Sequence, residues 1–322
     1  MKQVGIICGG YSSEFEISVK SATTIYDNFP KEYQAHLIFL RKSGWTVKDG
    51  ANELTLDPTS FTFEKNGEQV QIDVAIVFIH GDPGENGKIQ GYLEMIGIPY
   101  VNSGPLASQL SFDKWYCNQF LKGFDIKVAD SIYLTEAKEM PPSNKVVQQL
   151  GLPIFVKPCD SGSSYGIARV DAEEDLSTAV DDAFAEGKTV VLEAFLDGTE
   201  VTCAVYRTKN GLKALPMTEI VTENAFFDYE AKYLGESQEI TPARISDEQR
   251  DACMNVSKKI YQLLNLRSLA RVDFMLVNNI PYVIEVNTIP GFSAQSLVPQ
   301  MIACEGLSVA DFWREILEGE LE

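Results

Sequence analysis

The sequence predicts an α/β protein made of three units: an N-terminal parallel, Rossmann-like α/β domain followed by two α+β subdomains. Residues 1–103 alternate strand-like and helix-like patterns, which is typical of a parallel sheet covered by helices. Turn formers cluster at 102–105 and again at Asp197-Gly198, which predicts a central subdomain over 104–196 and a C-terminal subdomain over 197–322. The length of 322 residues exceeds that of one typical domain and fits this division.

The N-terminal unit begins with an apolar run at 4–8 that predicts a buried strand. Gly9-Gly10 then turns the chain into a helix, for which Ser13 and Glu16 predict a capping box. Further elements continue the alternation: strand-like runs at 35–40 and 72–79, a loop at 80–87, a helix with Ile89, Leu93 and Ile96 on one face, and a short strand at 98–101.

The two later units carry shorter elements. In the central unit we expect a helical stretch around Asp113-Lys114, strands at 154–156, 168–170 and 189–193, and a helix at 173–185. The C-terminal unit begins with strand-rich sequence at 200–206, crosses a polar aromatic loop at 226–233 and ends in helices. Apolar runs at 271–277 and 282–287 flank the turn-like residues 278–281 and predict a hairpin.

Composition excludes several classes of partner. The chain has 27 basic and 46 acidic residues, a net charge of −19, which argues against nucleic acid and against an anionic membrane surface. Six cysteines without a Cys-x-x-Cys pair favour reduced thiols in a cytoplasmic protein over zinc or a disulfide framework. The N-terminal apolar stretch is too short for a signal peptide, and no segment is long enough to insert into a membrane.

The predicted C-terminal hairpin contains acidic residues inside apolar runs. Alternation places Glu285 and Asn287 on one face of the second strand, and pairing could bring Asp273 opposite them. A buried charge needs a partner, and oxygen ligands without His or Cys suit Mg²⁺ or Mn²⁺ better than zinc. We expect a metal site open to phosphate; the alternative is a half-exposed hairpin whose acids face water.

A loop of small residues at 156–166 predicts a phosphate site. Consecutive backbone N–H groups and serine hydroxyls can cradle phosphate oxygens, and Lys157 at the strand end adds a positive charge. The alternative is an ordinary hairpin. The turn at 9–14 lacks two glycines of the dinucleotide fingerprint, so a nicotinamide dehydrogenase is a weaker prediction.

Five ordered motifs together resemble the ATP-grasp ligases, and more closely the D-alanine:D-alanine ligase family. They lie at 9–18, 80–91, 157–166, 230–233 and 271–297. The resemblance implies an ATP-grasp fold, in which the two α+β subdomains clamp ATP. It also implies that two D-alanine molecules are joined through an acyl phosphate for peptidoglycan synthesis, by a cytoplasmic enzyme that forms a homodimer. Left open are a related ligase making D-alanyl-D-lactate or D-alanyl-D-serine, and a non-catalytic nucleotide-binding module.

The resemblance also implies roles for single residues. Nucleotide contacts fall on Lys114, Lys157, Glu193, Ala194, Phe195, Leu196 and Glu200, and the ligands of two magnesium ions on Asp273, Glu285 and Asn287. The reaction itself falls on Glu14, Ser163, Lys232, Tyr233, Arg271 and Gly291, with His80, Ser296 and Leu297 binding the amino acids. Phe15 and Asp160-Ser161 depart from the family pattern, which leaves lid docking and phosphate affinity open.

Overall fold

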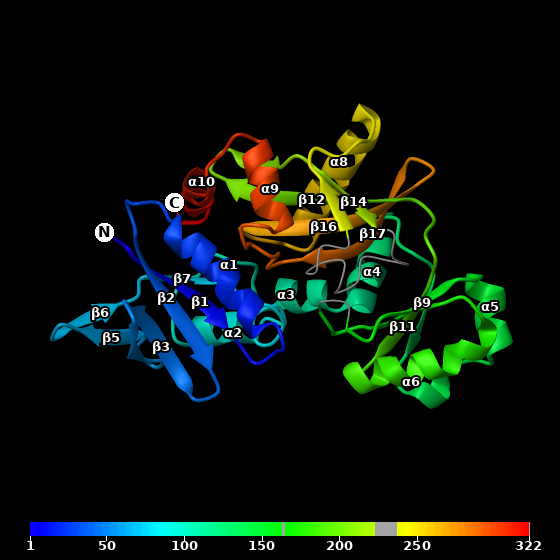
Figure 1. The fold of residues 1–322 in the computed structure, drawn as a ribbon, viewed down its shortest axis with the longest axis horizontal. Coiled ribbons are helices and arrows are strands. Elements are labelled where there is room, and N and C mark those ends of the chain that lie inside the picture. The colour runs from blue at the N-terminus through cyan, green and yellow to red at the C-terminus, as the bar shows by residue number, and fades with distance from the viewer. Residues whose placement is uncertain (163–164, 223–236, 322) are drawn as a thin grey trace.

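The computed structural model describes residues 1–162, 165–222 and 237–321 (Figure 1). Three sheets follow one another along the chain, with strands inside 3–77, 131–194 and 199–287, so each sheet lies within one of the three expected units. The domain boundaries themselves remain a prediction. No helix in the described part of the chain is both long and apolar enough to span a bilayer.

The first sheet combines a parallel part with an antiparallel extension. In the order β6-β5-β4-β3-β2-β1-β7, strand β1 is parallel to both β2 and β7, and the other pairs are antiparallel. Its strands are β1 (Gln3–Gly9), β2 (Gln34–Arg41), β3 (Gly44–Asp49), β4 (Asn52–Asp57), β5 (Thr62–Lys65), β6 (Glu68–Gln71) and β7 (Val74–Val77).

The predicted parallel core is thus present, but the meander β3 to β6 was not expected. Asn66-Gly67 between β5 and β6 has positive φ at both positions, 54° and 81°, as a tight two-residue hairpin turn requires. The expected strand at 98–101 is reduced to a single bridge between Tyr100 and Ala75. Helix α2 (Lys88–Met95) forms as predicted and buries Ile89 and Leu93.

Helix α1 (Phe15–Asp27) packs against β1 and β2, and its start corrects the sequence prediction. Its N-cap is Glu14, and no side chain caps the helix, so the capping box of Ser13 and Glu16 is wrong. The hydroxyl of Ser12 donates to the carbonyl of His80 instead, and it also accepts from the Glu14 N–H at 3.3 Å. Tertiary contact with the loop after β7 therefore decides how the helix begins.

The second sheet is antiparallel, in the order β10-β9-β11-β8. Its strands and surrounding helices are β8 (Ser131–Leu134), β9 (Ile154–Pro158), β10 (Ala168–Val170), β11 (Val190–Ala194), α5 (Ser143–Leu150), α6 (Leu176–Glu186) and the 3-10 turns Ala137–Glu139 and Glu173–Asp175. Strands β9, β10 and β11 and helix α6 match the expected segments closely, whereas β8 was not expected. Helices α3 (Pro105–Phe112) and α4 (Lys114–Lys122) precede this sheet but contribute Ala107, Cys117 and Leu121 to the core of the third sheet.

The third sheet contains the predicted hairpin. Its elements are β12 (Thr199–Thr208), β13 (Gly211–Ala214), β14 (Thr218–Thr222), β15 (Ser237–Ile240), α8 (Asp247–Leu263), β16 (Leu269–Val277), β17 (Ile280–Asn287), α9 (Leu297–Cys304) and α10 (Val309–Leu321). The turn between β16 and β17 consists of Asn278 and Asn279, both with positive φ, while Ile280 and Pro281 already belong to β17.

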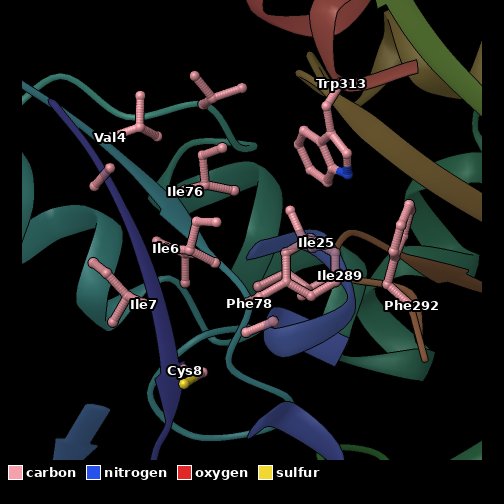
Figure 2. Packing of buried hydrophobic residues seen from close by; sticks show 14 of the residues in the cluster. Val4, Ile6, Ile7, Cys8, Ile25, Ile76, Phe78, Ile289, Phe292 and Trp313 are labelled. Atoms are coloured by element: carbon pink, nitrogen blue, oxygen red, sulfur yellow. The ribbon is translucent and has the colours of Figure 1, made fainter. Parts of the chain in front are cut away.

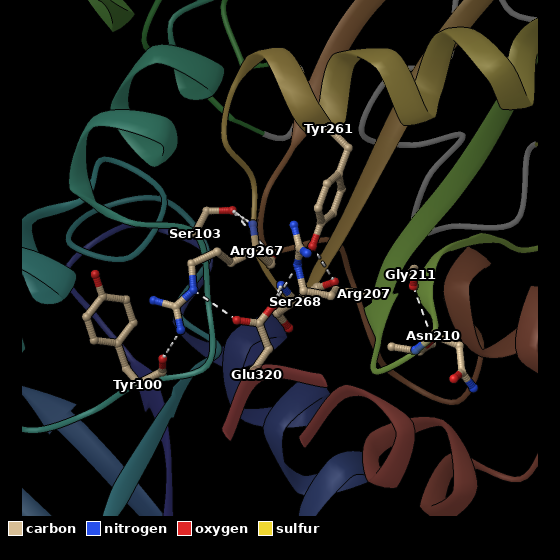
Figure 3. A network of polar contacts seen from close by, with 10 residues as sticks. Tyr100, Ser103, Arg207, Asn210, Gly211, Tyr261, Arg267, Ser268 and Glu320 are labelled. Atoms are coloured by element: carbon tan, nitrogen blue, oxygen red, sulfur yellow. Dashed lines mark hydrogen bonds and ion pairs between the residues drawn. The ribbon is translucent and has the colours of Figure 1, made fainter. Parts of the chain in front are cut away.

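The C-terminal segments hold the first and third sheets together. Trp313 of α10 and Phe292 pack their rings against Phe78, with centroids 5.9 and 5.7 Å from it (Figure 2). On the polar side, Arg267 donates to the Tyr100 carbonyl at 3.0 Å and pairs with Glu320 at 2.9 Å (Figure 3). The start of β16 is therefore fixed to the N-terminal unit through both apolar and charged contacts.

Candidate active site

Two adjoining cavities, of about 880 and 400 Å³, lie between the three sheets and share residues such as Lys114, Arg271 and Glu285. Every predicted site residue in the described part of the chain lines one or both. The larger cavity is lined by Glu14, His80, Lys114, Arg271, Glu285, Asn287, Gly291, Ser296 and Leu297. The smaller is lined by Lys114, Lys157, Glu193, Ala194, Phe195, Leu196, Glu200, Arg271, Asp273, Glu285 and Leu297. Predicted residues Ser163, Lys232 and Tyr233 lie outside the described residues.

The β16–β17 hairpin brings the predicted acids together. Asp273 pairs with Glu285, and Arg271 pairs with Asn287, so the predicted pairing of the two strands is confirmed. Arg271 donates to both oxygens of Asp273, at 2.8 and 2.7 Å, and Asn287 Nδ2 adds a third donor at 3.0 Å. The hydroxyl of Thr202 on β12 also donates to Asp273. The largely buried Asp273 carboxylate is thereby balanced by the Arg271 guanidinium.

The donor set at this hairpin suits a hard cation, with one qualification. Asp273, Glu285 and Asn287 offer two carboxylates and one amide, and oxygen donors are what Mg²⁺ and Mn²⁺ prefer. Among the described residues, no group of three or more His, Cys, Asp or Glu is arranged to hold a metal. A cation here therefore needs further ligands such as phosphate oxygens, and it competes with Arg271 for Asp273.

The predicted phosphate loop follows β9, which carries Lys157. The Lys157 ammonium lies 2.7 Å from Glu193 on β11, the strand paired with β9. Burial disfavours the charged ammonium, but the charge and hydrogen bond of Glu193, together with the charges of Glu285 and Glu200, outweigh burial and raise the pKa of Lys157. Lys114, at the start of α4, donates to the Ser161 carbonyl at 2.6 Å and so joins this helix to the loop. Two cations thus flank the loop.

The loop also lies directly against the N-terminal unit. A side-chain carbon at Gly162 would come within 2.9 Å of Glu14 Oε2, so a larger residue could not occupy this position without displacing the acid. Glu14 is mostly buried and lines the larger cavity. An acid from the first unit and a predicted phosphate loop from the second therefore face the same space.

His80 is buried at the end of the first sheet, and its ring is held by protein groups. Its Nε2 lies 3.1 Å from the Ser21 Oγ of α1, and the ring also forms a hydrogen bond with the backbone of Ile289. Burial lowers the pKa of His80 to about 4 against the opposing effect of Ile289, and the charge of Arg271 adds to the decrease. At neutral pH the imidazole is uncharged.

The segment after β17 forms the far wall of the larger cavity. Ser296 is the N-cap of α9, but its Oγ contacts Ser293 Oγ at 2.8 Å and accepts from the Ser293 N–H at 3.0 Å. Gly291 approaches it closely, since a side-chain carbon there would lie 3.2 Å from Ser296 Oγ. Backbone N–H groups, a hydroxyl and a helix start thus meet at one wall, which is suited to a carboxylate or an oxyanion.

Sequence reasoning did not single out Glu85 and Glu239, which line the larger cavity, or Asn118, which contacts Glu193. Burial and the nearby Glu14 charge raise the pKa of Glu85 to about 8, and its carboxylate accepts from the Gly81 N–H at 2.8 Å. Glu239 lines the larger cavity, and the buried Asn118 donates to Glu193 at 3.2 Å. Glu85 lies in the 80–87 loop, which belongs to one of the five motifs, so the sequence could have identified it. Glu239 and Asn118 lie in none of the motifs, and only the fold reveals their contacts.

The comparisons with known proteins agree over the whole chain. Residues 3–103 match the family model described as D-ala D-ala ligase N-terminus, and residues 120–318 match D-ala D-ala ligase C-terminus. A D-alanine–D-alanine ligase of Parabacteroides distasonis is 43% identical over 324 residues, covering 100% of this chain and 98% of the relative.

Solved structures give the same result. The VanG D-Ala:D-Ser ligase from Enterococcus faecalis has a TM-score of 0.86 at 28% identity, covering 98% of both chains. The D-alanine–D-alanine ligase from Bacillus anthracis complexed with ATP has a TM-score of 0.80 at 27% identity, covering 100% of this chain and 98% of that one. The ATP-grasp fold predicted from the sequence is confirmed, and the chain belongs to the D-alanine–D-alanine ligase family.

Proposed function

We propose that this protein joins two D-alanine molecules to D-alanyl-D-alanine, with ATP converted to ADP and phosphate, for peptidoglycan precursor synthesis. The observation that carries the proposal is the meeting of Glu14, the Gly162 backbone and Arg271 at one cavity. Glu14 can bind an ammonium group, the loop a phosphate, and Arg271 a developing oxyanion. A ligase that activates an amino acid needs these three groups around one carboxylate.

The smaller cavity takes ATP in this proposal. Phe155, Met275 and Val283 provide apolar walls for adenine, and Glu193 with the backbone of 194–196 reads its edge. Glu200 binds the ribose, while Lys114 and Lys157 bind phosphate oxygens. Lys114 lines both cavities, which adjoin at this residue. The terminal phosphate would therefore lie near Glu14 and the first amino acid.

Mg²⁺ or Mn²⁺ is part of the proposal for an electrostatic reason. The two cavities contain more carboxylates than cations, including Glu193, Glu200, Asp273 and Glu285, and these would repel a triphosphate. Two ions held by Asp273, Glu285 and Asn287 would reverse that repulsion and stabilise charge on the phosphate oxygens.

In the first step, a carboxylate oxygen of the first D-alanine forms a bond to the γ-phosphorus of ATP, and the bond to the β–γ bridging oxygen breaks to release ADP. Glu14 holds the ammonium of this D-alanine, and Lys157 stabilises the transferred group. Ser163, Tyr233 and Lys232 are assigned here from the family resemblance alone: the first two orient the amino acid, and Lys232 contacts the phosphate.

In the second step, the amine of the second D-alanine forms a bond to the acyl carbon, and phosphate leaves as the tetrahedral oxyanion collapses. The amine proton is lost to solvent. Arg271 and the Gly291 N–H stabilise the oxyanion, and Ser296 with the Leu297 N–H binds the second carboxylate. His80 was assigned to substrate binding; the contacts of its ring with Ser21 and Ile289 favour a supporting position at the cavity wall.

A panel of amino acids tests the proposal directly. Purified protein with ATP and Mg²⁺ is expected to release phosphate in the presence of D-alanine and to form D-alanyl-D-alanine, identified by mass spectrometry. L-alanine is the matched control, because Glu14 and the phosphate loop fix the stereochemistry at the first site. Phosphate release with another acid pair, but none with D-alanine, would refute the assignment.

A D-alanyl-D-serine product is the second candidate, because the VanG D-Ala:D-Ser ligase resembles this chain over 98% of its length; D-lactate as second substrate is tested beside it. The test supplies D-alanine with D-serine or D-lactate in competition and measures product ratios. D-alanyl-D-alanine is expected to dominate.

We place the enzyme in the cytoplasm, since all six cysteines, which lie in the described part of the chain, are free thiols. A homodimer remains a prediction.

A further inference from the structure

Ser21 is a fully buried serine in α1 to which the proposed chemistry assigns no role. Its Oγ accepts the backbone N–H of Phe292 at 3.1 Å and lies 3.1 Å from Nε2 of His80. Phe292 follows Gly291 in the segment that carries the groups assigned to the second step. One hydroxyl therefore connects the N-terminal helix, the histidine loop and the wall where acyl transfer is proposed.

The contacts of Ser21 determine which His80 nitrogen carries the proton. The Ser21 oxygen already accepts from Phe292, and its buried hydroxyl hydrogen needs an acceptor. Within the described part of the chain, His80 Nε2 is the acceptor that Ser21 meets. Nε2 is therefore unprotonated, Nδ1 carries the hydrogen, and the ring donates it to the backbone of Ile289.

These two hydrogen bonds hold the peptides on either side of the Pro290–Gly291 peptide. The Ile289 carbonyl belongs to the peptide that ends at Pro290, and the Phe292 N–H belongs to the peptide that begins at Gly291. Between them lies the Pro290–Gly291 peptide, which carries the Gly291 N–H. Proline restricts φ at one end of this peptide, so holding both neighbouring peptides leaves the Gly291 N–H little freedom of direction.

Side-chain packing reinforces the same attachment. Phe292 is fully buried and lies with its ring 5.7 Å from that of Phe78 and 5.7 Å from that of Trp313. Ile289 packs into the same cluster beside Ile25 of α1 (Figure 2). The apolar contacts hold the segment against the first sheet, and the Ser21 hydrogen bonds set the rotation of its peptides.

We infer that Ser21, acting through His80, is a positioning residue that orients the Gly291 N–H for the second step of the reaction. The inference rests on the proposed function. Glu14 at the start of α1 binds the first D-alanine, and Ser21, two turns later, sets the wall that receives the second. A single rigid helix thus aligns the two substrate sites with each other.

Ser21→Ala is the test, with Ser18→Ala as a matched control. Ser18 lies in the same helix, is equally buried, and forms two hydrogen bonds, from the Gly9 N–H at 2.8 Å and to the Phe78 carbonyl at 2.7 Å. Both of its bonds stay within the N-terminal unit. Ser21→Cys keeps the volume and a weak donor, so it provides the graded conservative variant.

The measured quantity is phosphate released per dipeptide formed, together with the KM of each D-alanine. For Ser21→Ala we expect dipeptide formation to fall roughly tenfold or more, the KM of the second D-alanine to rise, and the ratio to exceed one as unused acyl phosphate hydrolyses. Affinity for a non-hydrolysable ATP analogue should not change. Ser21→Cys should lie between, and Ser18→Ala should keep the wild-type ratio even where it lowers stability.

A ratio of one in Ser21→Ala, with both KM values unchanged, would overturn the inference, as would the same uncoupling in Ser18→Ala. Failure of the proposed function appears separately, as wild-type protein that forms no dipeptide.

A nitrogen NMR spectrum of the wild-type histidines tests the geometry without catalysis. The chain has only two histidines, and His36 faces the Gln3 Oε1 with its Nε2 at 2.6 Å, so the two rings should show opposite tautomers. A proton on Nε2 of His80 would contradict the arrangement.

Discussion

Arg271 holds the carboxylate of Asp273 through two parallel hydrogen bonds of 2.8 and 2.7 Å, although both side chains project from the same strand, two residues apart. The pair lies where the two cavities meet, since Arg271 lines both. A residue assigned to the oxyanion is thus attached to a residue assigned to the metal. A change in the charge of Arg271 or Asp273 therefore alters the electrostatic environment of the other residue.

Arg271→Met is expected to abolish dipeptide formation while ATP binding weakens much less. The substitution removes the guanidinium proposed to stabilise the oxyanion but leaves Lys114 and Lys157, the proposed phosphate ligands, in the smaller cavity. Steady-state dipeptide synthesis and ATP affinity by calorimetry measure the two effects. Arg271→Lys, which keeps the charge without the two-pronged geometry, should retain a small part of the activity. Undiminished turnover in the methionine variant would exclude the role.

Asp273→Asn is expected to shift magnesium activation to higher concentrations, by roughly tenfold or more, because the site loses a charged ligand. Turnover measured against Mg²⁺ concentration, with ATP held constant, gives the midpoint. Thr202→Val is the comparison: it removes one hydrogen bond to Asp273 but leaves the ligand in place, so its midpoint should move less. Equal midpoints in wild type and Asp273→Asn would mean that Asp273 binds no cation.

Glu193→Gln is expected to lower both ATP affinity and stability. The change leaves the buried Lys157 ammonium without its partner at 2.7 Å, which costs about 3 kcal/mol of unfolding free energy. Urea unfolding and the KM for ATP are the measurements. Arg250→Ala, which breaks an exposed ion pair with Asp247 on α8, should leave both quantities little changed. A variant as stable as wild type would show that the Lys157–Glu193 pair contributes nothing net.

Stability should depend on pH through His80. Its pKa is about 4 in the folded protein and 6.5 ordinarily, so between these values the unfolded chain binds more protons than the folded one. Stability therefore rises with pH across this window and is lost as pH falls, by about 3 kcal/mol for this group. Urea unfolding at several pH values should show a weaker dependence in His80→Gln. Parallel curves for the two proteins would contradict the prediction.

Glu320→Gln should destabilise the junction between the first and third sheets. Glu320 is nearly buried, pairs with Arg267 at 2.9 Å and accepts from the Ser268 N–H at 2.7 Å (Figure 3). Losing the charge is expected to cost about 2 kcal/mol, read from thermal or urea unfolding. Glu318→Gln, in the same helix but with a more exposed partner at 3.2 Å, is the control and should change little. A larger loss in the control would place the strength of the junction elsewhere.

Local sequence was sufficient to predict an element wherever a single strong pattern covered that element. The existence of the β16–β17 hairpin and strand β10 at its expected bounds follow from alternation and turn chemistry, whereas the two-residue turn and the bulge between Asp273 and Phe274 that set the register were not expected. The wrong capping box at Ser13 and the unexpected β3–β6 meander show the limit of that approach. In the first case a contact with the loop after β7 replaced the local cap, and in the second the strands are short and half-exposed.

The sequence by itself determined the α/β class, the family and most of the charged residues that line the two cavities, because motifs at fixed spacing name chemical groups. Only the tertiary structure decided which groups touch: that Gly162 lies against Glu14, that Arg271 occupies both oxygens of Asp273, and that Ser21 reaches a peptide 271 positions away. The reason is physical. Hydrogen bonds and burial depend on atoms brought together from distant parts of the chain, and no local pattern encodes that proximity.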